Sequence, residues 1–238
     1  MLRLVWVIGI SLPFIVYYFF RLVYVEVHPE KFTEESRYAV ARNMISHVMR
    51  NAFIHTKGYG LEKLPAEGGY LIYPNHQGKY DVLGIIHVHD KPCTIVIDEK
   101  RSHLPLANEV TRLLKGVRLD RTDMRAQVEG IMQIADEVKQ GRRYILFAEG
   151  GYTFNENHLQ EFHAGAFKCA LKAKCPIVPV ALVDSYVPFG RNGLQPVFTQ
   201  VHFLDPIPYE SYKNCKTQEI AAMVKQAIQT KLDELKKN

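Results

Sequence analysis

The spacing of apolar residues changes along the chain, and the first part is the most apolar. Leu4 to Phe20 are 17 consecutive residues without a charge, and Arg3 and Arg21 flank them. As a helix this run measures about 25 Å, slightly less than the roughly 30 Å hydrocarbon core of a bilayer. We therefore expect a hydrophobic helical membrane anchor. The length leaves open whether it crosses the membrane or lies in one leaflet.

Proline and tyrosine positions add detail to this expected helix. Pro13 in the middle of the run predicts a kink, and the tyrosines Tyr17, Tyr18 and Tyr24 gather near its far end, as in helices whose aromatic end lies at headgroup depth. No small-residue cleavage site follows, so a cleaved signal peptide is not favoured. One arginine on each flank does not determine the orientation.

A second part, from about Thr33 to Asn51, has the period of an amphipathic helix. Thr33 is a typical N-cap with Glu34 and Glu35 in the first turn. The apolar positions that share one face are Tyr38, Ala41, Ile45, Val48, Met49 and Ala52. This face either covers a globular core or lies beside the first helix in the membrane interface. We place residues 1–52 together as membrane-anchoring helices.

From about residue 53 short apolar runs alternate with helical segments, which is typical of an α/β domain. We expect a mixed, largely parallel sheet flanked by helices. The predicted strands are 70–73, 94–97, 117–119, 144–147, 177–182 and 199–203. The predicted helices are 82–89, 104–114, 123–140, 164–173 and 218–235.

Composition narrows the class of protein. With 238 residues, 47% of them hydrophobic and 23% charged, the chain is long enough for one large domain with a small appendage. A formal charge of +5 suits an anionic partner such as phosphate, nucleic acid or a membrane surface. The four cysteines show no disulfide-scaffold or zinc spacing, so we expect a reducing compartment and no metal site.

Local charge favours a lipid surface over nucleic acid. Residues 100–125 contain seven Lys and Arg but three Asp and Glu. Such a segment is either an ordinary solvated face or a surface attracted to anionic headgroups. No aromatic-basic RNA motif or helix-turn-helix pattern accompanies it, and we expect no nucleic-acid partner.

Candidate chemistry lies in the loops that follow two predicted strands, where α/β sheets usually place it. His76 and Asp81 are five residues apart across a glycine-containing turn after the first predicted strand. The carboxylate can accept a proton from one ring nitrogen and leave the other to take a proton from a hydroxyl. Spacing alone favours the simpler interpretation, in which Asp81 caps the next helix. The second loop contains Glu149, Gly150, Gly151 and Tyr152.

Four ordered blocks over about residues 58–183 resemble the glycerolipid acyltransferases, the lysophosphatidic acid acyltransferase family. Asn75, His76 and Asp81 resemble the N-H-x-x-x-x-D block, which includes the HX4D motif. The second and third blocks correspond to Gly116–Arg121 and to Phe147–Gly150, which resembles F-P-E-G. The fourth corresponds to Phe162, Gly165, Ala166 and Phe167 with the strand Pro176–Val180.

The resemblance implies an O-acyltransferase of phospholipid biosynthesis. It would move a fatty acyl chain from acyl-CoA or acyl-ACP to the hydroxyl of a lysophospholipid such as 1-acylglycerol-3-phosphate. His76 would be the general base and Asp81 its orienter. Asn75, Glu149, Gly150, Gly151 and Tyr152 would contact substrate, and Arg121 would bind the acceptor phosphate. The expected partners are membrane lipid and the thioester donor, with no further cofactor. We expect the domain of residues 53–238 on the cytoplasmic face of the membrane.

The chain departs from the family pattern at one position that matters for the acceptor. Where the third block usually reads E-G-T-R, this chain has Tyr152 in place of the arginine, and Ala148 replaces the proline. Loss of one charge-assisted contact to phosphate removes about 1.5–3 kcal/mol unless another group replaces it. Lys79, Arg118 and Arg142 are candidates for that replacement.

Three alternatives follow from this departure and from the motifs. The first is an acyltransferase for a lysolipid with another head group. The second is a catalytically silent, membrane-tethered lipid-binding protein. The third is a hydrolase with a Ser or Cys nucleophile, although no G-x-S-x-G motif occurs.

Overall fold

A seven-stranded sheet forms the centre of the protein. The structure, a computed structural model, describes residues 2–104, 107–120, 122–153 and 155–237. The strand order is β1-β7-β6-β2-β5-β3-β4, and neighbours are parallel except for the antiparallel pair β6 and β7. The strands are β1 (Ile54–Tyr59), β2 (Leu71–Pro74), β3 (Thr94–Asp98), β4 (Val117–Leu119), β5 (Tyr144–Ile145), β6 (Ile177–Val183) and β7 (Val197–Phe203).

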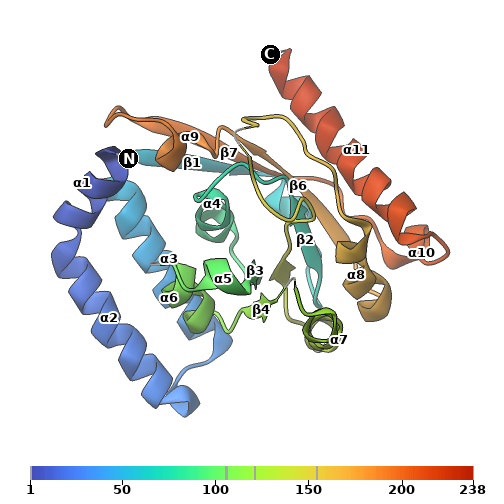
Figure 1. Ribbon diagram of the computed structural model, residues 1–238, viewed down its shortest axis with the longest axis horizontal. Helices are drawn as coiled ribbons and strands as arrows, with labels where there is room; N and C mark the ends of the chain where they lie inside the picture. Colours follow the sequence, from blue (N-terminus) through green and yellow to red (C-terminus); the bar gives the residue numbers. More distant parts are fainter. Residues whose placement is uncertain (1, 105–106, 121, 154, 238) are drawn as a thin grey trace.

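Helices cover both faces of this sheet (Figure 1). One side carries α1 (Leu2–Ile10), α2 (Leu12–Val27), α3 (Glu34–Asn51), α4 (Asp81–Val88), α5 (Glu99–Ser102) and α6 (Ala107–Leu113). The other carries α7 (Met124–Lys139), α8 (Lys168–Ala173) and α11 (Thr217–Lys236). The remaining short helices are α9 (Val187–Gly190), α10 (Tyr209–Tyr212) and the 3-10 helices Pro29–Lys31, Leu61–Lys63 and Ala164–Phe167.

The core is divided into two layers by the alternation of side chains along the strands. In β2, Ile72 belongs to the cluster under α3, α4 and α6, whereas Leu71 and Tyr73 belong to the cluster under α7, α8 and α11. Successive strand side chains point to opposite faces, so a strand covered on both sides must be apolar at every position. This explains why β2 and β6 read as continuous apolar runs in the sequence.

The predicted α/β class with a mixed, largely parallel sheet is confirmed. Each predicted strand is present within a few residues of its expected limits. The strand β1 was not predicted, because its sequence IHTKGY places polar residues at the sheet edge and buries Ile54 alone. The interior strands, by contrast, are apolar enough to be recognised.

The N-terminal run differs from the single kinked helix expected around Pro13. It forms two helices, α1 and α2, with Ser11 between them, and Pro13 lies in the first turn of α2. Proline fits this first turn because the amide hydrogen it lacks has no helical partner there. Among the described residues, no helix is both long and apolar enough to cross a membrane.

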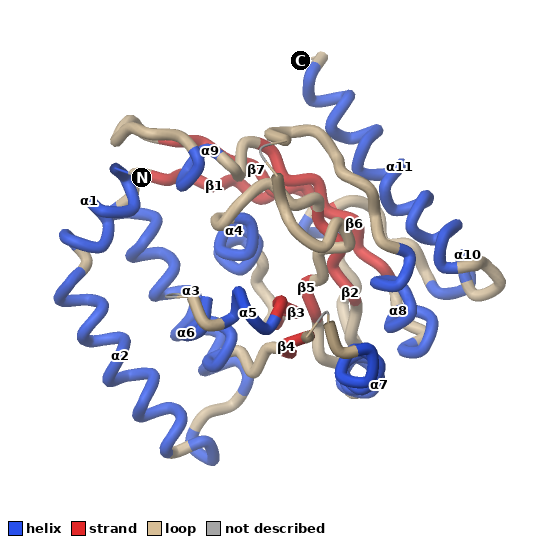
Figure 2. Tube along the Cα trace, viewed as in Figure 1, coloured by secondary structure: helices blue, strands red, loops and turns tan. Residues whose placement is uncertain are grey.

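The helix pair α1–α2 lies against the domain through α3, α6 and α9 (Figure 2). Leu22 and Val25 reach the same hydrophobic cluster as Ile45 of α3. The apolar face of α3 packs on α4, α6 and β1, while α3 also contacts α1 and α2. The expectation that this face covers the globular core is therefore confirmed. The assignment of residues 1–52 to a membrane anchor stays a prediction.

A fully buried histidine makes stability depend on pH. His89 receives a hydrogen bond from the Tyr70 hydroxyl at Nε2 (2.8 Å) and bonds the Lys91 carbonyl through Nδ1 (2.6 Å). Burial lowers its pKa to about 4. The unfolded chain takes up a proton near pH 6.5 and the folded chain does not, so stability is lost as pH falls from about 6.5 to 4.

We expect the melting temperature to fall across this pH range, with His89 contributing about 3 kcal/mol when the loss is complete. The variant His89→Gln should be less stable at neutral pH and should have a shallower pH dependence of the melting temperature. The exposed His158 provides the matched control, and His158→Gln should keep the wild-type slope. Equal slopes for His89→Gln and the wild type would contradict this assignment.

Candidate active site

His76 and Asp81 form a close pair at the carboxyl end of β2. The strand ends at Pro74, a loop follows, and Asp81 is the first residue of α4. His76 Nδ1 lies 2.7 Å from Asp81 Oδ2, and the imidazole is 14% exposed while the carboxylate has no exposed surface. A carboxylate beside Nδ1 holds the proton there and leaves Nε2 as the basic nitrogen.

The buried Asp81 carboxylate is fully supplied with hydrogen-bond donors. Besides His76, its Oδ2 accepts the backbone N–H groups of Gln77 (2.6 Å) and Gly78 (2.9 Å). Its Oδ1 accepts the hydroxyl of Ser185 at 2.5 Å. A buried carboxylate needs such bonds in place of water, and these donors hold the Asp81 side chain in position.

The loop after β2 is also hydrogen-bonded to the end of β6 and to the residues that follow it. The Asn75 side chain accepts the Leu182 N–H (2.7 Å) and donates to the Leu182 carbonyl (3.1 Å). Gln77 donates to Asn157 (2.8 Å) and to the same Leu182 carbonyl (2.9 Å), and it accepts the Ser185 N–H (2.8 Å). Because β2 and β6 are parallel neighbours, their carboxyl ends meet at one edge and these bonds become possible.

Glu149 approaches the pair from the loop after β5. The residue is 6% exposed, and its Oε2 accepts the Gln160 amide (2.7 Å), which also donates to the Gly151 carbonyl (2.8 Å). Its Oε1 is buried without a hydrogen-bond partner in the described part of the chain. Burial raises the pKa of this carboxyl, and the Gln160 and His76 contacts oppose that shift. Gly150 turns the loop with a φ of +71°, which favours glycine.

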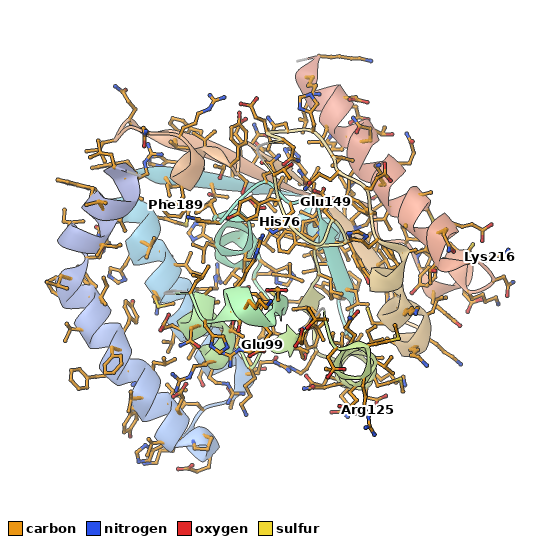
Figure 3. All side chains as sticks on the ribbon, viewed as in Figure 1. His76, Glu99, Arg125, Glu149, Phe189 and Lys216 are labelled. Atoms are coloured by element: carbon orange, nitrogen blue, oxygen red, sulfur yellow. The ribbon has the colours of Figure 1, made fainter. Side chains whose placement is uncertain are left out.

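Aromatic rings enclose the imidazole. The Phe147 ring stacks on His76 with 4.0 Å between ring centres, and Tyr152 meets it edge-on at 4.9 Å. The guanidinium carbon of Arg101, on α5, lies 5.4 Å from the centre of the Tyr152 ring. His76 and Glu149 lie close together over the carboxyl ends of the strands, beside α4 (Figure 3).

The structure brings together most of the residues that the sequence singled out. His76, Asp81, Glu149, Gly150, Gly151 and Tyr152 border one region, whereas both ends of the Asn75 amide are used by Leu182. Arg121 lies outside the described residues. Arg142, one suggested replacement for the missing arginine, pairs with Glu34 and Glu137. Arg118, another, donates to Asn108 (2.9 Å).

Three residues of the site were not identified from the sequence. Ser185 follows β6 and Arg101 follows β3, so each occupies the carboxyl end of a strand, a position that could have indicated them. Gln160 lies eleven residues beyond Glu149 in an irregular loop, and no local pattern indicates it. The contacts of Ser185 with Asp81 and of Arg101 with Tyr152 join segments that follow different strands.

The arrangement suits proton abstraction from a hydroxyl. A carboxylate-oriented imidazole is a general base, and nearby rings limit its access to water. Among the described residues no group of three or more His, Cys, Asp or Glu side chains could hold a metal ion.

A protein-family model covers the part of the chain that contains these residues. The model of the family described as Acyltransferase matches residues 55–183. That range extends from β1 to the end of β6, and it contains His76, Asp81 and Glu149.

The relatives described next have low sequence identity to this chain, and their names state the same activity. Over 178 residues the chain is 25% identical to acl-2 of Caenorhabditis elegans, named for 1-acyl-sn-glycerol-3-phosphate acyltransferase activity, covering 74% of this chain and 63% of that protein. It is 25% identical over 170 residues to the 1-acyl-sn-glycerol-3-phosphate acyltransferase of Escherichia coli, and the match covers 71% of this chain and 69% of that protein. The chain thus spans less than two thirds of the nematode protein.

A solved structure shares the fold. The crystal structure of the 1-acyl-sn-glycerophosphate (LPA) acyltransferase PlsC from Thermotoga maritima superposes with a TM-score of 0.80, covering 100% of this chain and 96% of that one at 21% identity. With the family model matching more than half of its length, the chain belongs to the acyltransferase family.

Proposed function

We propose that this chain transfers a fatty acyl group from an acyl thioester, acyl-CoA or acyl-ACP, to the hydroxyl of a lysophospholipid. The supporting observation is the His76–Asp81 pair, 2.7 Å apart, in a chain of the acyltransferase family. The activity named for the relatives supports 1-acylglycerol-3-phosphate as the proposed acceptor, with phosphatidic acid as the proposed product.

In the proposed reaction the acceptor hydroxyl gives its proton to His76 Nε2 as its oxygen attacks the thioester carbonyl. The new C–O bond forms a tetrahedral intermediate, whose collapse breaks the C–S bond and releases the thiolate. The proton held by His76 then passes to that sulfur. Asp81 orients the ring and stabilises the imidazolium between these steps.

The position of Ser185 supports direct transfer over a hydrolase mechanism. In a nucleophilic triad the serine hydroxyl donates a hydrogen bond to the histidine, which in turn donates one to the acid. Here the Ser185 hydroxyl donates its hydrogen bond to Asp81 Oδ1, the carboxylate oxygen that does not contact His76. The residue is 3% exposed. Ser185 is therefore a positioning residue in this proposal, and no acyl-enzyme is required.

We also propose that α1 and α2 attach the protein to a membrane surface, with the catalytic domain on the cytoplasmic face. Their polar groups are directed inward: Arg3 donates to the Pro188 carbonyl (3.1 Å), Asn51 to Ser11 (2.8 Å), and Arg112 pairs with Glu26. The outer surface is apolar, with the exposed large side chains Leu2, Val5, Trp6, Ile8, Ile10, Leu12, Phe14, Ile15, Val16, Tyr17, Phe19, Phe20, Val23, Tyr24 and Val27. Such a patch marks an interaction surface and suits helices that lie in the headgroup region.

The variants His76→Ala and Asp81→Asn should lower acyl transfer by about 10²–10⁴-fold, because each removes general-base catalysis. Purified protein is offered acyl-CoA or acyl-ACP with a panel of lysolipids, and product formation is measured. His55→Ala, at an exposed histidine on β1, should keep full activity. A labelled acyl group that stays covalently bound to His76→Ala would contradict direct transfer, and absence of transfer by the wild type would favour a lipid-binding protein.

Ser185→Ala should leave Asp81 Oδ1 unpaired, which costs about 1–3 kcal/mol in a buried site. We expect kcat to fall about tenfold with the KM of both substrates unchanged, because the carboxylate loses one of the donors that fix its position beside His76. Ser185→Thr retains the hydroxyl and should restore kcat. A loss of stability with an unchanged kcat would show that Ser185 supports the fold alone.

The double variant Phe19→Glu, Phe20→Glu should bind phospholipid vesicles more than tenfold more weakly. Burying one such side chain contributes about 1.5–3 kcal/mol, and both rings are exposed, so the fold should be retained. Co-sedimentation with vesicles measures the change. Met124→Glu, at a similarly exposed apolar residue on α7, should bind as the wild type does.

A further inference from the structure

The outer face of α7 carries a stripe of exposed apolar side chains. Met124, Val128 and Met132 recur every four residues along this helix, and they are 79%, 53% and 38% exposed. Side chains at this spacing lie on one side of a helix. The inner side of α7 already contributes to the core through buried residues such as Ile134 and Val138. The stripe is therefore additional to the core, and a cluster of this kind marks an interaction surface.

A hollow lies beside this stripe, between α7 and the edge of the sheet. β4 pairs with β3 on one side and stands at the end of the strand order. The hollow measures about 410 Å³. It is lined by Gly116, Val117 and Arg118 on the strand side and by Ala126, Glu129, Gly130 and Gln133 on the helix side. A groove of this kind next to exposed apolar residues suits the side chains of a partner helix.

Positive charge surrounds the hollow. Lys115 precedes its strand side in the chain, Arg125 precedes its helix side, and Arg118 lines it. Lys115 is exposed and forms no ion pair with another described residue. Arg118 donates to Asn108 through Nη2 (2.9 Å), but its Nε is buried without a hydrogen-bond partner in the described part of the chain. These groups are available to a carboxylate from outside the protein.

The acidic side chains next to the hollow have partners within the protein. Glu129 lies 3.6 Å from Arg125, and Asp123 caps α7 by accepting the backbone N–H groups of Arg125 (2.8 Å) and Ala126 (3.2 Å). The sequence from residue 100 to residue 125 has seven Lys and Arg against three Asp and Glu. This excess of positive charge attracts an acidic partner and raises its rate of encounter.

The position of α7 separates this surface from the proposed membrane contact. α1 and α2 cover one face of the sheet and α7 covers the other (Figure 1). A membrane against the outer side of α1 and α2 therefore lies away from α7. The helix α7 also begins where β4 ends, and β4 is parallel to the strands that lead to His76 and Glu149. A protein bound along α7 thus lies at the same edge of the sheet as the site, on the side away from the membrane.

We infer that this surface, which comprises Met124, Val128, Met132, Lys115 and Arg118, docks an acyl carrier protein that presents acidic side chains beside an apolar helix face. The inference rests on the proposed acyl transfer and assigns acyl-ACP as a donor in it. Methionine and arginine are typical of protein interfaces. Acyl-CoA has no protein part and does not need this surface, so the two donors separate docking from chemistry.

Transfer from two donors with the same acyl chain tests this docking surface. Palmitoyl-ACP or palmitoyl-CoA is offered with 1-acylglycerol-3-phosphate, and KM is measured for each donor. The double variant Met124→Glu, Val128→Glu should raise KM for palmitoyl-ACP at least about tenfold, because it replaces apolar contacts with charges that repel the carrier. Lys115→Glu should change this KM in the same direction. KM for palmitoyl-CoA and binding to phospholipid vesicles should stay unchanged in both variants.

Two control variants make the same chemical changes elsewhere. Phe198→Glu adds a carboxylate at a 70% exposed apolar residue on β7, and Lys236→Glu reverses an exposed charge at the end of α11. Both should keep the wild-type KM for palmitoyl-ACP. An equal rise of KM for both donors in the double variant would overturn the inference, as would a wild type that uses palmitoyl-CoA alone. Loss of vesicle binding with an unchanged KM for palmitoyl-ACP would overturn it in favour of a membrane contact.

Direct binding of palmitoyl-ACP keeps the docking surface testable without turnover. Fluorescence anisotropy of the labelled carrier is measured with each protein in the absence of acceptor. Weaker binding to the double variant than to the wild type or Phe198→Glu would support the docking surface even if no acceptor is acylated, and only the proposed transfer would then fail. Equal binding to all three proteins, or no binding to the wild type, would overturn the inference.

Discussion

The burial of the Asp81 carboxylate is the constraint on which the site depends. A charge without access to water needs donors from the protein, and here they come from the loop after β2 and from Ser185 after β6. These segments are more than one hundred residues apart in the chain. Both segments donate hydrogen bonds to the same carboxylate. If the loop after β2 changed its path, the buried Asp81 side chain would lose donors. His76 takes its orientation from this fixed carboxylate, so the proposed base is held by the interior of the fold.

The sheet topology determines which other groups reach that base. β2 lies between β6 and β5, and β3 follows β5, all parallel with their carboxyl ends at one edge. The segment that follows each strand carries one polar group of the site: His76 after β2, Ser185 after β6, Glu149 after β5 and Arg101 after β3. Glu149 Oε1 has no hydrogen-bond partner among the residues that the structure describes, so this edge is not optimised for stability alone. A ligand that donates a hydrogen bond there would offset the cost.

The interior of the fold was predicted from local patterns, and the contact between His76 and Asp81 was predicted from their spacing together with the family motif. Strands buried on both faces are continuous apolar runs, and the pair spans a single turn. The edge strand β1 was missed since half of its positions face solvent, and the helix break at Ser11 was missed because proline in a first turn looks like a mid-helix kink. Ser185 and Arg101 were missed because their contacts come from other loops at the same edge of the sheet. Gln160 was missed because no local pattern links it to Glu149.

The inward-facing polar groups of α1 and α2 have a kinetic consequence for the proposed reaction. Hydrogen bonds and an ion pair join these helices to α3, α6 and α9, so the apolar surface and the catalytic edge move as one body. A protein bound through that surface meets a lipid acceptor by lateral diffusion in two dimensions. Its rate then follows the mole fraction of acceptor in the surface, and dilution by inert lipid slows turnover even when the bulk concentration of acceptor is constant.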